Sequence, residues 1–239
     1  MRTIAIGDIH GCFKAVSSLI EAIAPTKDDL LIFLGDYIDR GPDSRGTVDF
    51  LLDLQSNHRT VFLKGNHELL FEDAVVREQD PTLWFHNGGR MTLTTYGGKI
   101  SSIPDKHRRF LVETVPCLET ESDIFVHANY LPHVPIHESP PEIMYWEHIY
   151  DRLPRPHVSG KTVWIGHSPQ MNGWIADYHH LICIDTFCFG GRYLTAVDVD
   201  SRQIWQADRN GMIRGSQSPL VQAYRGAHRM VTNFLRRED

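Results

Sequence analysis

The chain has 239 residues, a formal net charge of −6 and 14 histidines. This length allows one large domain with a buried core, although it also permits two domains. The negative net charge gives no whole-molecule attraction to nucleic acid or to anionic membranes, so we expect neither as a partner. We find no apolar leader and no uninterrupted apolar stretch of about 20 residues, which predicts a soluble, cytoplasmic protein.

The first third of the sequence alternates between apolar runs and amphipathic segments. Short apolar runs predict three strands, at residues 3–6, 30–34 and 60–63. Apolar residues at helical spacing predict three helices, at residues 13–23, 47–54 and 69–76. The second helix follows a candidate cap at Asp43 or Ser44. This alternation favours a parallel sheet covered by helices.

The later part of the chain is richer in predicted strands. They lie at residues 124–126, 163–165, 181–184, 193–199 and 203–206, the last two forming a hairpin. We therefore expect a second, mostly β sheet packed on the first. The segment 130–143 contains four prolines and is expected to be an irregular surface loop. Near the C-terminus, residues 230–237 are expected to form a short surface helix.

Each of the first three predicted strands runs into a loop in which Gly precedes Asp or Asn. The loops read Gly7-Asp8-Ile9-His10-Gly11, Gly35-Asp36-Tyr37-Ile38-Asp39-Arg40-Gly41 and Gly65-Asn66-His67-Glu68. Ligands of open α/β sheets bind at the carboxyl ends of the strands, so the three loops predict one site. Asp8 and His10 are two residues apart and would project to the same side of an extended backbone. Carboxylate, amide and imidazole groups together suit a divalent metal ion.

The three motifs resemble the signature of the phosphoprotein-phosphatase branch of the calcineurin-like metallophosphoesterases. Their order along the chain and their spacing of about thirty residues resemble that signature as well. Asp39-Arg40-Gly41 is typical of this branch. His127 and His167 resemble its two later metal-binding histidines, and residues 183–198 resemble the closing strands of bacterial and phage members. The resemblance covers residues 2–207. It implies a single α/β catalytic domain (1–207), a two-sheet β-sandwich in a four-layer α/β/β/α arrangement, followed by a C-terminal extension (208–239).

The resemblance also implies two divalent or trivalent metal ions. Asp8, His10 and Asp36 would hold the first, and Asp36 would bridge to the second. The remaining ligands of the second ion would be Asn66, His127 and His167. Manganese is the expected metal, with iron and zinc as alternatives, because nitrogen and oxygen ligand sets of this kind accept all three.

Three further residues complete the implied catalytic machinery. His67 would protonate the leaving alkoxide as general acid, Asp39 would orient His67, and Arg40 would hold phosphate oxygens. Glu68 is expected to bind loop amides rather than metal.

A second phosphate contact is less well defined. Where bacterial relatives often carry an arginine, this chain has His148. Arg152 would lie on the same helix face if residues 142–152 were helical. Either side chain could substitute for that arginine.

We therefore predict a metal-dependent phosphatase of the serine/threonine protein phosphatase type, acting on phosphorylated proteins or small phosphoesters. An alternative is a hydrolase of dinucleoside polyphosphates such as diadenosine tetraphosphate, because that branch carries the same motifs. A binding module with a decayed site is disfavoured, since every implied ligand and His67 are present. The sequence gives no indication of oligomeric state.

Overall fold

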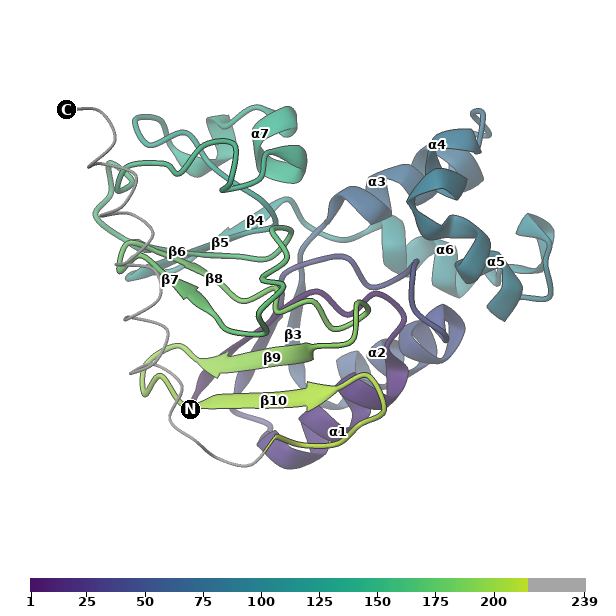
Figure 1. Cartoon of the computed structure of the whole chain (residues 1–239), viewed down its shortest axis with the longest axis horizontal. Helices are drawn as coiled ribbons and strands as arrows, with labels where there is room; N and C mark the ends of the chain where they lie inside the picture. The colour runs from purple at the N-terminus through teal and green to yellow at the C-terminus, as the bar shows by residue number, and fades with distance from the viewer. Residues whose placement is uncertain (215–239) are drawn as a thin grey trace.

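Two five-stranded sheets form the centre of residues 1–214, the part of the protein that the computed structural model describes (Figure 1). The first sheet has the order β10-β9-β1-β2-β3, and the second has the order β4-β5-β6-β8-β7. The strands of the first sheet are β1 (Thr3–Ile6), β2 (Leu30–Phe33), β3 (Arg59–Phe62), β9 (Tyr193–Asp198) and β10 (Ile204–Asp208). Those of the second are β4 (Cys117–Glu119), β5 (Asp123–Val126), β6 (Thr162–Ile165), β7 (Ala176–Asp177) and β8 (Leu181–Cys183).

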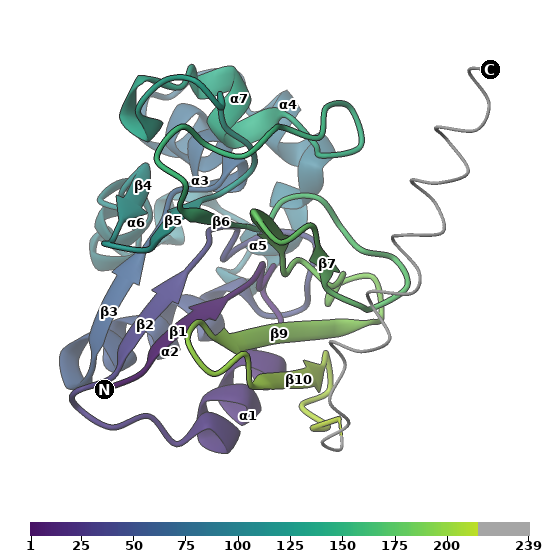
Figure 2. The same cartoon turned by 90° about the vertical axis from the view of Figure 1, so that its left-hand side faces the viewer.

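The two sheets pack face to face, and helices cover their outer faces (Figures 1 and 2). Along β1, Ala5 belongs to the core between the sheets, whereas Ile4 and Ile6 belong to the core beneath the helices. Phe125 of β5 and Trp164 of β6 fill the space between the sheets from the other side. Because both faces of each sheet are buried, the central strands are continuous apolar runs. The predicted α/β fold, a two-sheet sandwich flanked by helices, is confirmed.

The helices lie in three groups. Helices α1 (Phe13–Ile23) and α2 (Ser44–Asn57) cover the first sheet, and α7 (Pro141–Trp146) covers the second. Short helices to one side are α3 (Asn66–Phe71), α4 (Thr82–Trp84), α5 (Arg90–Thr95) and α6 (Asp105–Val112). Shorter turns are the π-helical η1 (Glu72–Val76) and η2 (Phe85–Gly89) and the 3₁₀-helical η3 (Ile100–Ser102) and η4 (Ile136–Glu138). The predicted cap of α2 is Asp43, whose carboxylate accepts a hydrogen bond from the Gly46 amide.

The hairpin of β9 and β10 belongs to the first sheet, not to the second as expected. Strand β1 pairs in parallel with β2 on one side and antiparallel with β9 on the other. The register places Ala5 opposite Val197, and both side chains are buried in the core between the sheets. The late hairpin therefore covers an edge of β1 that would otherwise expose unpaired backbone groups.

Two expectations for residues 130–152 can be compared with the structure. The proline-rich segment is irregular, but Tyr130 and Ile136 are buried against the second sheet, so it is not a simple surface loop. The condition under which Arg152 would share a helix face, a helix over residues 142–152, is not met, because α7 ends at Trp146 and Glu147 is extended. The chain is held in this turn because the Asn129 amide donates to both the Glu147 carboxylate and the Arg152 carbonyl.

The predicted boundary between residues 207 and 208 falls inside β10, which continues to Asp208. Ile213 then bridges back to Ala207, and the Arg214 guanidinium lies 4.0 Å from the centre of the Trp174 ring. The rest of the predicted extension, including the helix at 230–237, lies outside the described residues. Within residues 1–214, no helix has the length and apolar character needed to cross a membrane.

Candidate metal centre

The loops that follow β1, β2, β3, β5 and β6 bring the predicted metal ligands together where the two sheets meet. The side chains form two groups, and within each group the possible ligand atoms lie within 4.8 Å of one another. One group is His10, Asp36 and His67, and the other is Asp36, His127 and His167. All five side chains are buried. Asp36 belongs to both groups, as expected for a bridging ligand.

The two carboxylate oxygens of Asp36 face different histidines. His10 Nε2 lies 3.4 Å from Oδ2, and His127 Nε2 lies 3.4 Å from Oδ1. Two ligand atoms that bind the same metal ion at about 2.0–2.2 Å lie roughly 3–3.5 Å from each other. The spacing therefore fits an ion on each side of the carboxylate.

Backbone carbonyls fix which nitrogen of each histidine is available to a metal. His10 Nδ1 lies 3.0 Å from the Ile38 carbonyl, and His127 Nδ1 lies 2.7 Å from the Leu34 carbonyl. His167 Nε2 lies 3.1 Å from the carbonyl of Trp146. Because a carbonyl only accepts, each of these nitrogens is the donor.

The opposite nitrogens, Nε2 of His10 and His127 and Nδ1 of His167, therefore carry no proton and offer a lone pair, and those of His10 and His127 lie 3.4 Å from oxygens of Asp36. Such an outer ring of carbonyls is what orients metal-binding histidines.

The Asn66 side-chain amide lies among the second group of possible ligands, Asp36, His127 and His167. Its Oδ1 is 3.1 Å from His127 Nε2, a nitrogen that carries no proton. Turning the amide over would direct its NH₂ to both oxygens of Asp36 and to His167 Nδ1, each at 3.2 Å. An amide oxygen surrounded only by acceptors is costly unless a cation lies among them. The present orientation is the one that suits a metal ligand.

Asp8 is held at the edge of the centre. Its Oδ2 accepts a hydrogen bond from the His167 amide at 3.0 Å, whereas Oδ1 is buried without a hydrogen-bond partner among residues 1–214. A Cβ at Gly166 would come within 2.0 Å of Oδ1, so only glycine permits this approach. The pKa of Asp8 is raised by burial and by the nearby carboxylates of Asp185 and Asp36. Three crowded carboxylates and an unpartnered oxygen call for a cation.

The extended backbone expected from Asp8 to His10 is not kept at His10. His10 has a φ of 47°, in the left-handed region, because the chain turns sharply after β1. Asp36 and His167 (φ 55° and 60°) are also left-handed, as are Asp39 and Arg40 (φ 71° and 65°). Such conformations cost about 1–3 kcal/mol each and concentrate at functional sites. Five of the predicted site residues share this strain.

His67, a member of the first group, forms a buried pair with Asp39. His67 Nδ1 lies 2.7 Å from Asp39 Oδ2, and His67 Nε2 has no hydrogen-bond partner within residues 1–214. That nitrogen is 4.0 Å from Asp36 Oδ2. Asp39 is itself held by the Trp84 indole at 3.0 Å and the Thr92 hydroxyl at 2.6 Å. The sequence analysis missed Trp84 and Thr92, because neither lies in a motif.

The histidines divide into two electrostatic classes. Burial lowers the pKa of His10 and of His127, and it lowers that of His167 to about 3. Burial acts in the same direction on His67, but Asp36 and Asp39 raise the pKa of His67 above its ordinary value. Neutral imidazoles suit metal ligation, whereas a histidine that retains its proton suits general acid catalysis.

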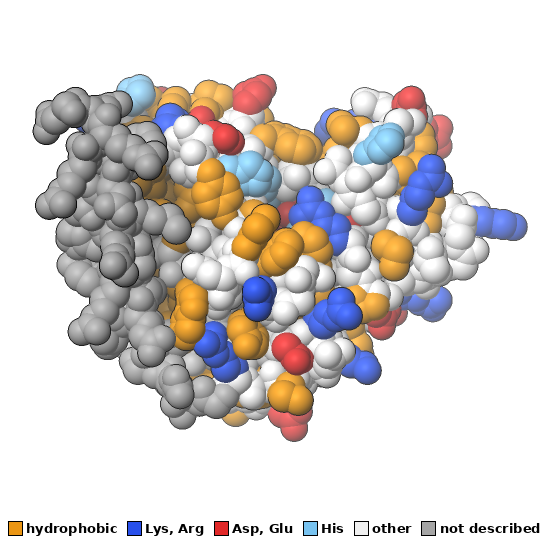
Figure 3. Space-filling view, viewed as in Figure 1, with side chains coloured by type: hydrophobic (Ala, Val, Ile, Leu, Met, Phe, Trp, Pro, Cys, Tyr) orange, Lys and Arg blue, Asp and Glu red, His pale blue; other side chains and the backbone are white. Residues whose placement is uncertain are grey.

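Arg40 lies at the rim of this cluster. Its Nη1 donates to His10 Nε2 at 3.1 Å, and its guanidinium lies 4.9 Å from the centre of the Phe189 ring. Phe189 also packs edge-on against the His10 ring. Figure 3 shows the surface hollowed near the middle of the molecule, with histidine, basic and hydrophobic side chains around the hollow.

The two candidates for the second phosphate contact lie in different surroundings. The His148 ring stacks on His167 with 4.2 Å between ring centres, which places it beside the predicted metal ligands. Arg152 instead pairs with Glu147 and donates to the Tyr130 carbonyl. The structure thus brings His148 to the centre and engages Arg152 elsewhere.

Glu68 ties two of the loops together. Its carboxylate accepts hydrogen bonds from the backbone amides of Asp36, Tyr37 and Gly65 at 2.9–3.0 Å. The expectation that Glu68 binds loop amides rather than metal agrees with these contacts. Glu68 thereby fixes Asp36 relative to the start of α3, which carries Asn66 and His67.

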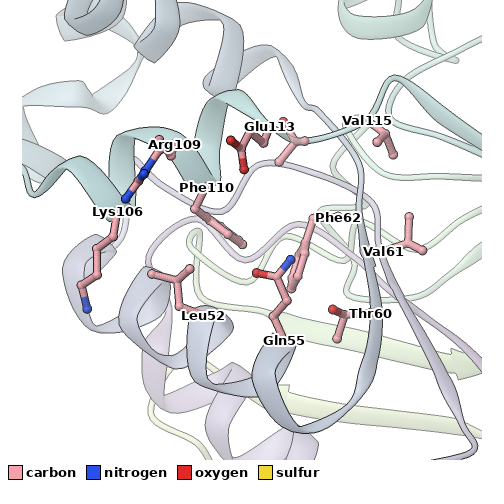
Figure 4. A pocket seen from close by; sticks show the side chains of 11 residues that line it. Leu52, Gln55, Thr60, Val61, Phe62, Lys106, Arg109, Phe110, Glu113 and Val115 are labelled. Carbon is pink, nitrogen blue, oxygen red and sulfur yellow. The ribbon is translucent and has the colours of Figure 1, made fainter.

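A separate pocket of about 400 Å³ lies between α2, β3 and α6 (Figure 4). Leu52, Phe62 and Phe110 line it together with Lys106, Arg109 and Glu113. None of the predicted ligands or catalytic residues lines this pocket.

Residues 1–181 match the sequence family of the calcineurin-like phosphoesterases. The chain belongs to this family. The metal-binding chemistry of the family agrees with the two ligand groups around Asp36.

Individual relatives match over shorter stretches. Serine/threonine-protein phosphatase 1 of Salmonella typhimurium is 44% identical over 85 residues, which cover 35% of this chain and 37% of that protein. A symmetrical bis(5'-nucleosyl)-tetraphosphatase of Cellvibrio japonicus is 46% identical over 70 residues, 29% of this chain and 25% of that protein. The chain therefore matches between a quarter and little more than a third of the length of these curated relatives.

Solved structures share the fold over most of the chain. A structure described as a candidate diadenosine tetraphosphatase has a TM-score of 0.66 and 22% identity, covering 86% of this chain and 92% of the other. A metallophosphoesterase of Sphaerobacter thermophilus has a TM-score of 0.51 and 18% identity, covering 85% and 86%. At these identities the likeness establishes the fold alone.

We expect Glu68→Gln to lower the free energy of unfolding by about 1–3 kcal/mol, because one amide oxygen cannot satisfy three buried backbone donors. Glu121→Gln, at an exposed position, is the matched control and should change stability by less than about 0.5 kcal/mol. Urea unfolding of the metal-free proteins measures both changes. Equal stability of the Glu68 variant and the control would contradict the role of Glu68 as a clamp.

Proposed function

We propose that the protein hydrolyses phosphomonoesters at a centre of two metal ions, as a phosphatase of the serine/threonine protein phosphatase type. The observation that supports this most is the position of Asp36. Its carboxylate is shared by two groups of nitrogen and oxygen ligands, and the His67–Asp39 pair lies directly beside it. The ligands would be Asp8, His10 and Asp36 for one ion, and Asp36, Asn66, His127 and His167 for the other.

The donor set fits divalent ions of the manganese, iron or zinc type, and manganese is the proposed occupant. When bound, the two ions would lower the pKa of a water molecule between them and polarise the phosphate oxygens. The protein itself supplies ligands of low negative charge, since three histidines and Asn66 are neutral. The centre therefore keeps a net positive charge for a phosphate dianion.

The remaining groups of the site have distinct tasks. His67 carries a proton on Nδ1 toward Asp39 and presents Nε2 to the centre, where it can hold the proton that the leaving oxygen needs. Asp39 orients this ring, and Trp84 and Thr92 orient Asp39. Arg40 presents a guanidinium without a carboxylate partner among residues 1–214, which suits phosphate oxygens. His148, stacked on His167, is the better placed candidate for a second phosphate contact.

Hydrolysis of dinucleoside polyphosphates is the alternative, since a relative named as a protein phosphatase and one named as a bis(5'-nucleosyl)-tetraphosphatase both match part of the chain. We expect manganese-dependent turnover of p-nitrophenyl phosphate and of a phosphothreonine peptide, abolished by chelation and restored by Mn²⁺. Diadenosine tetraphosphate assayed in parallel distinguishes the two substrate classes. Turnover of diadenosine tetraphosphate without turnover of the peptide would favour the alternative, and no turnover of any of the three would refute the proposal.

We expect His67→Asn to reduce kcat on an alkyl phosphate by about 10²–10⁴-fold and kcat on p-nitrophenyl phosphate much less. The reason is that p-nitrophenolate leaves without protonation, whereas an alkoxide does not. His133→Asn, at an exposed histidine, is the control. Equal losses on the two substrates would rule out a general acid role for His67.

A further inference from the structure

A second pocket, of about 470 Å³, opens beside Arg40. Its walls come from the first turn of α1, the loop before α2, the start of α5, the β8–β9 loop and the turn after β10. Three cationic side chains and three apolar ones line the pocket: Lys14, Arg40 and Arg209, and Phe13, Met91 and Phe189. A Cβ at Gly211 would come within 3.0 Å of the Lys14 carbonyl, which shows how closely this last turn lies on α1.

The pocket and the candidate metal centre share a wall. Arg40 lines the pocket, yet its guanidinium donates to His10 Nε2. Phe189 lines the pocket as well, and its ring packs against both the His10 ring and the Arg40 guanidinium. A group in this pocket would therefore contact Arg40 and Phe189, which also contact the predicted ligand His10.

The pocket is positively charged in a protein of net charge −6. Three cationic side chains line it against one carboxylate, that of Asp43, which is engaged by the Gly46 amide as the cap of α2. Within the described part of the chain, Lys14 and Arg209 make no ion pair or side-chain hydrogen bond. The first turn of α1 also contains no acidic residue. Unpaired like charges around one concavity repel one another, and an anion relieves that repulsion.

The pocket is also partly apolar. The Phe13 and Phe189 rings and the Met91 thioether lie among the cations. Phosphate alone would use only the charged rim, whereas an organic group attached to a phosphate would use both kinds of surface. The volume is in the range of small-ligand pockets.

We propose that this pocket is a subsite for a second phosphate of the substrate, next to the phosphate that is cleaved, with its organic portion against the two phenylalanines. The inference rests on the proposed hydrolysis at the metal centre. Arg40 would contact both phosphates, while Lys14 and Arg209 would contact only the second. Two substrates offer this chemistry: a nucleotide with a phosphate chain and a peptide with two neighbouring phosphoresidues.

The test compares substrates with one and two phosphates in the manganese-loaded protein. One arm uses a singly and a doubly phosphorylated peptide of the same sequence, and the other uses adenosine monophosphate and adenosine diphosphate. The variant is Lys14→Ala/Arg209→Ala, and the control is Lys27→Ala/Lys99→Ala, two exposed lysines away from the pocket. Both double variants remove the same net charge. The measured quantity is the ratio of kcat/KM for two phosphates over one phosphate.

We expect the Lys14/Arg209 variant to lower this ratio by about tenfold or more, from the loss of two charge-assisted contacts, and the control to keep the wild-type ratio. A loss confined to one arm identifies the source of the second phosphate. An unchanged ratio in both arms, or an equal loss in the control, would overturn the proposal.

A binding measurement separates this proposal from the proposed function. Calorimetry of inorganic pyrophosphate and inorganic phosphate on the same proteins needs no turnover. We expect pyrophosphate binding, relative to phosphate, to weaken about tenfold in the Lys14/Arg209 variant only. If the protein turns over no substrate but shows this loss, the subsite stands and the hydrolysis fails. If turnover is normal and the Lys14/Arg209 variant binds pyrophosphate like the wild type, the proposed hydrolysis stands and the subsite is refuted.

Discussion

The candidate site depends on one buried carboxylate, that of Asp36. Its two oxygens face His10 and His127 at equal distances, and its position is set by Glu68, which holds the amides of Asp36, Tyr37 and Gly65. Burial opposes the charge on Asp36, but neighbouring histidines, among them the proton-bearing His67, lower its pKa below the ordinary value. A charged group at such depth is stable only with positive partners. Two cations, one on each side of the carboxylate, would meet that requirement.

The two sheets explain how these partners reach Asp36. The parallel strands β1 and β2 deliver Asp8, His10 and Asp36, and the second sheet delivers His127 and His167 from β5 and β6. Backbone carbonyls then select the free nitrogen of three histidines, while Asp39 selects that of His67. The same four side chains thus acquire two chemistries from their neighbours. Burial lowers the pKa of three of them, as suits the proposed metal ligands, whereas Asp36 and Asp39 raise the pKa of the fourth, His67, as suits the proposed general acid.

Much of this could be predicted from the sequence, because the signals are local. Continuous apolar runs mark the buried strands, and the Gly-Asp and Gly-Asn loops mark the ends at which ligands gather. Contacts between distant segments were beyond prediction. Trp84 and Thr92 reach Asp39 through the packing of short helices with no motif, and the late hairpin joins β1 through tertiary pairing. Whether a helix continues to residue 152 was likewise left open by the sequence, because Asn129 and the Glu147–Arg152 pair hold that segment in a turn, and helix propensity does not register such contacts.

Whether Asp36 bridges two metal ions can be seen in a crystal structure of the manganese-loaded protein with anomalous scattering from manganese. We expect two anomalous peaks about 3.5–4 Å apart. One peak would lie toward His10 and the other toward His127 and His167, with Asp36 between them. A single peak, or two peaks that do not share Asp36, would contradict this bridging role.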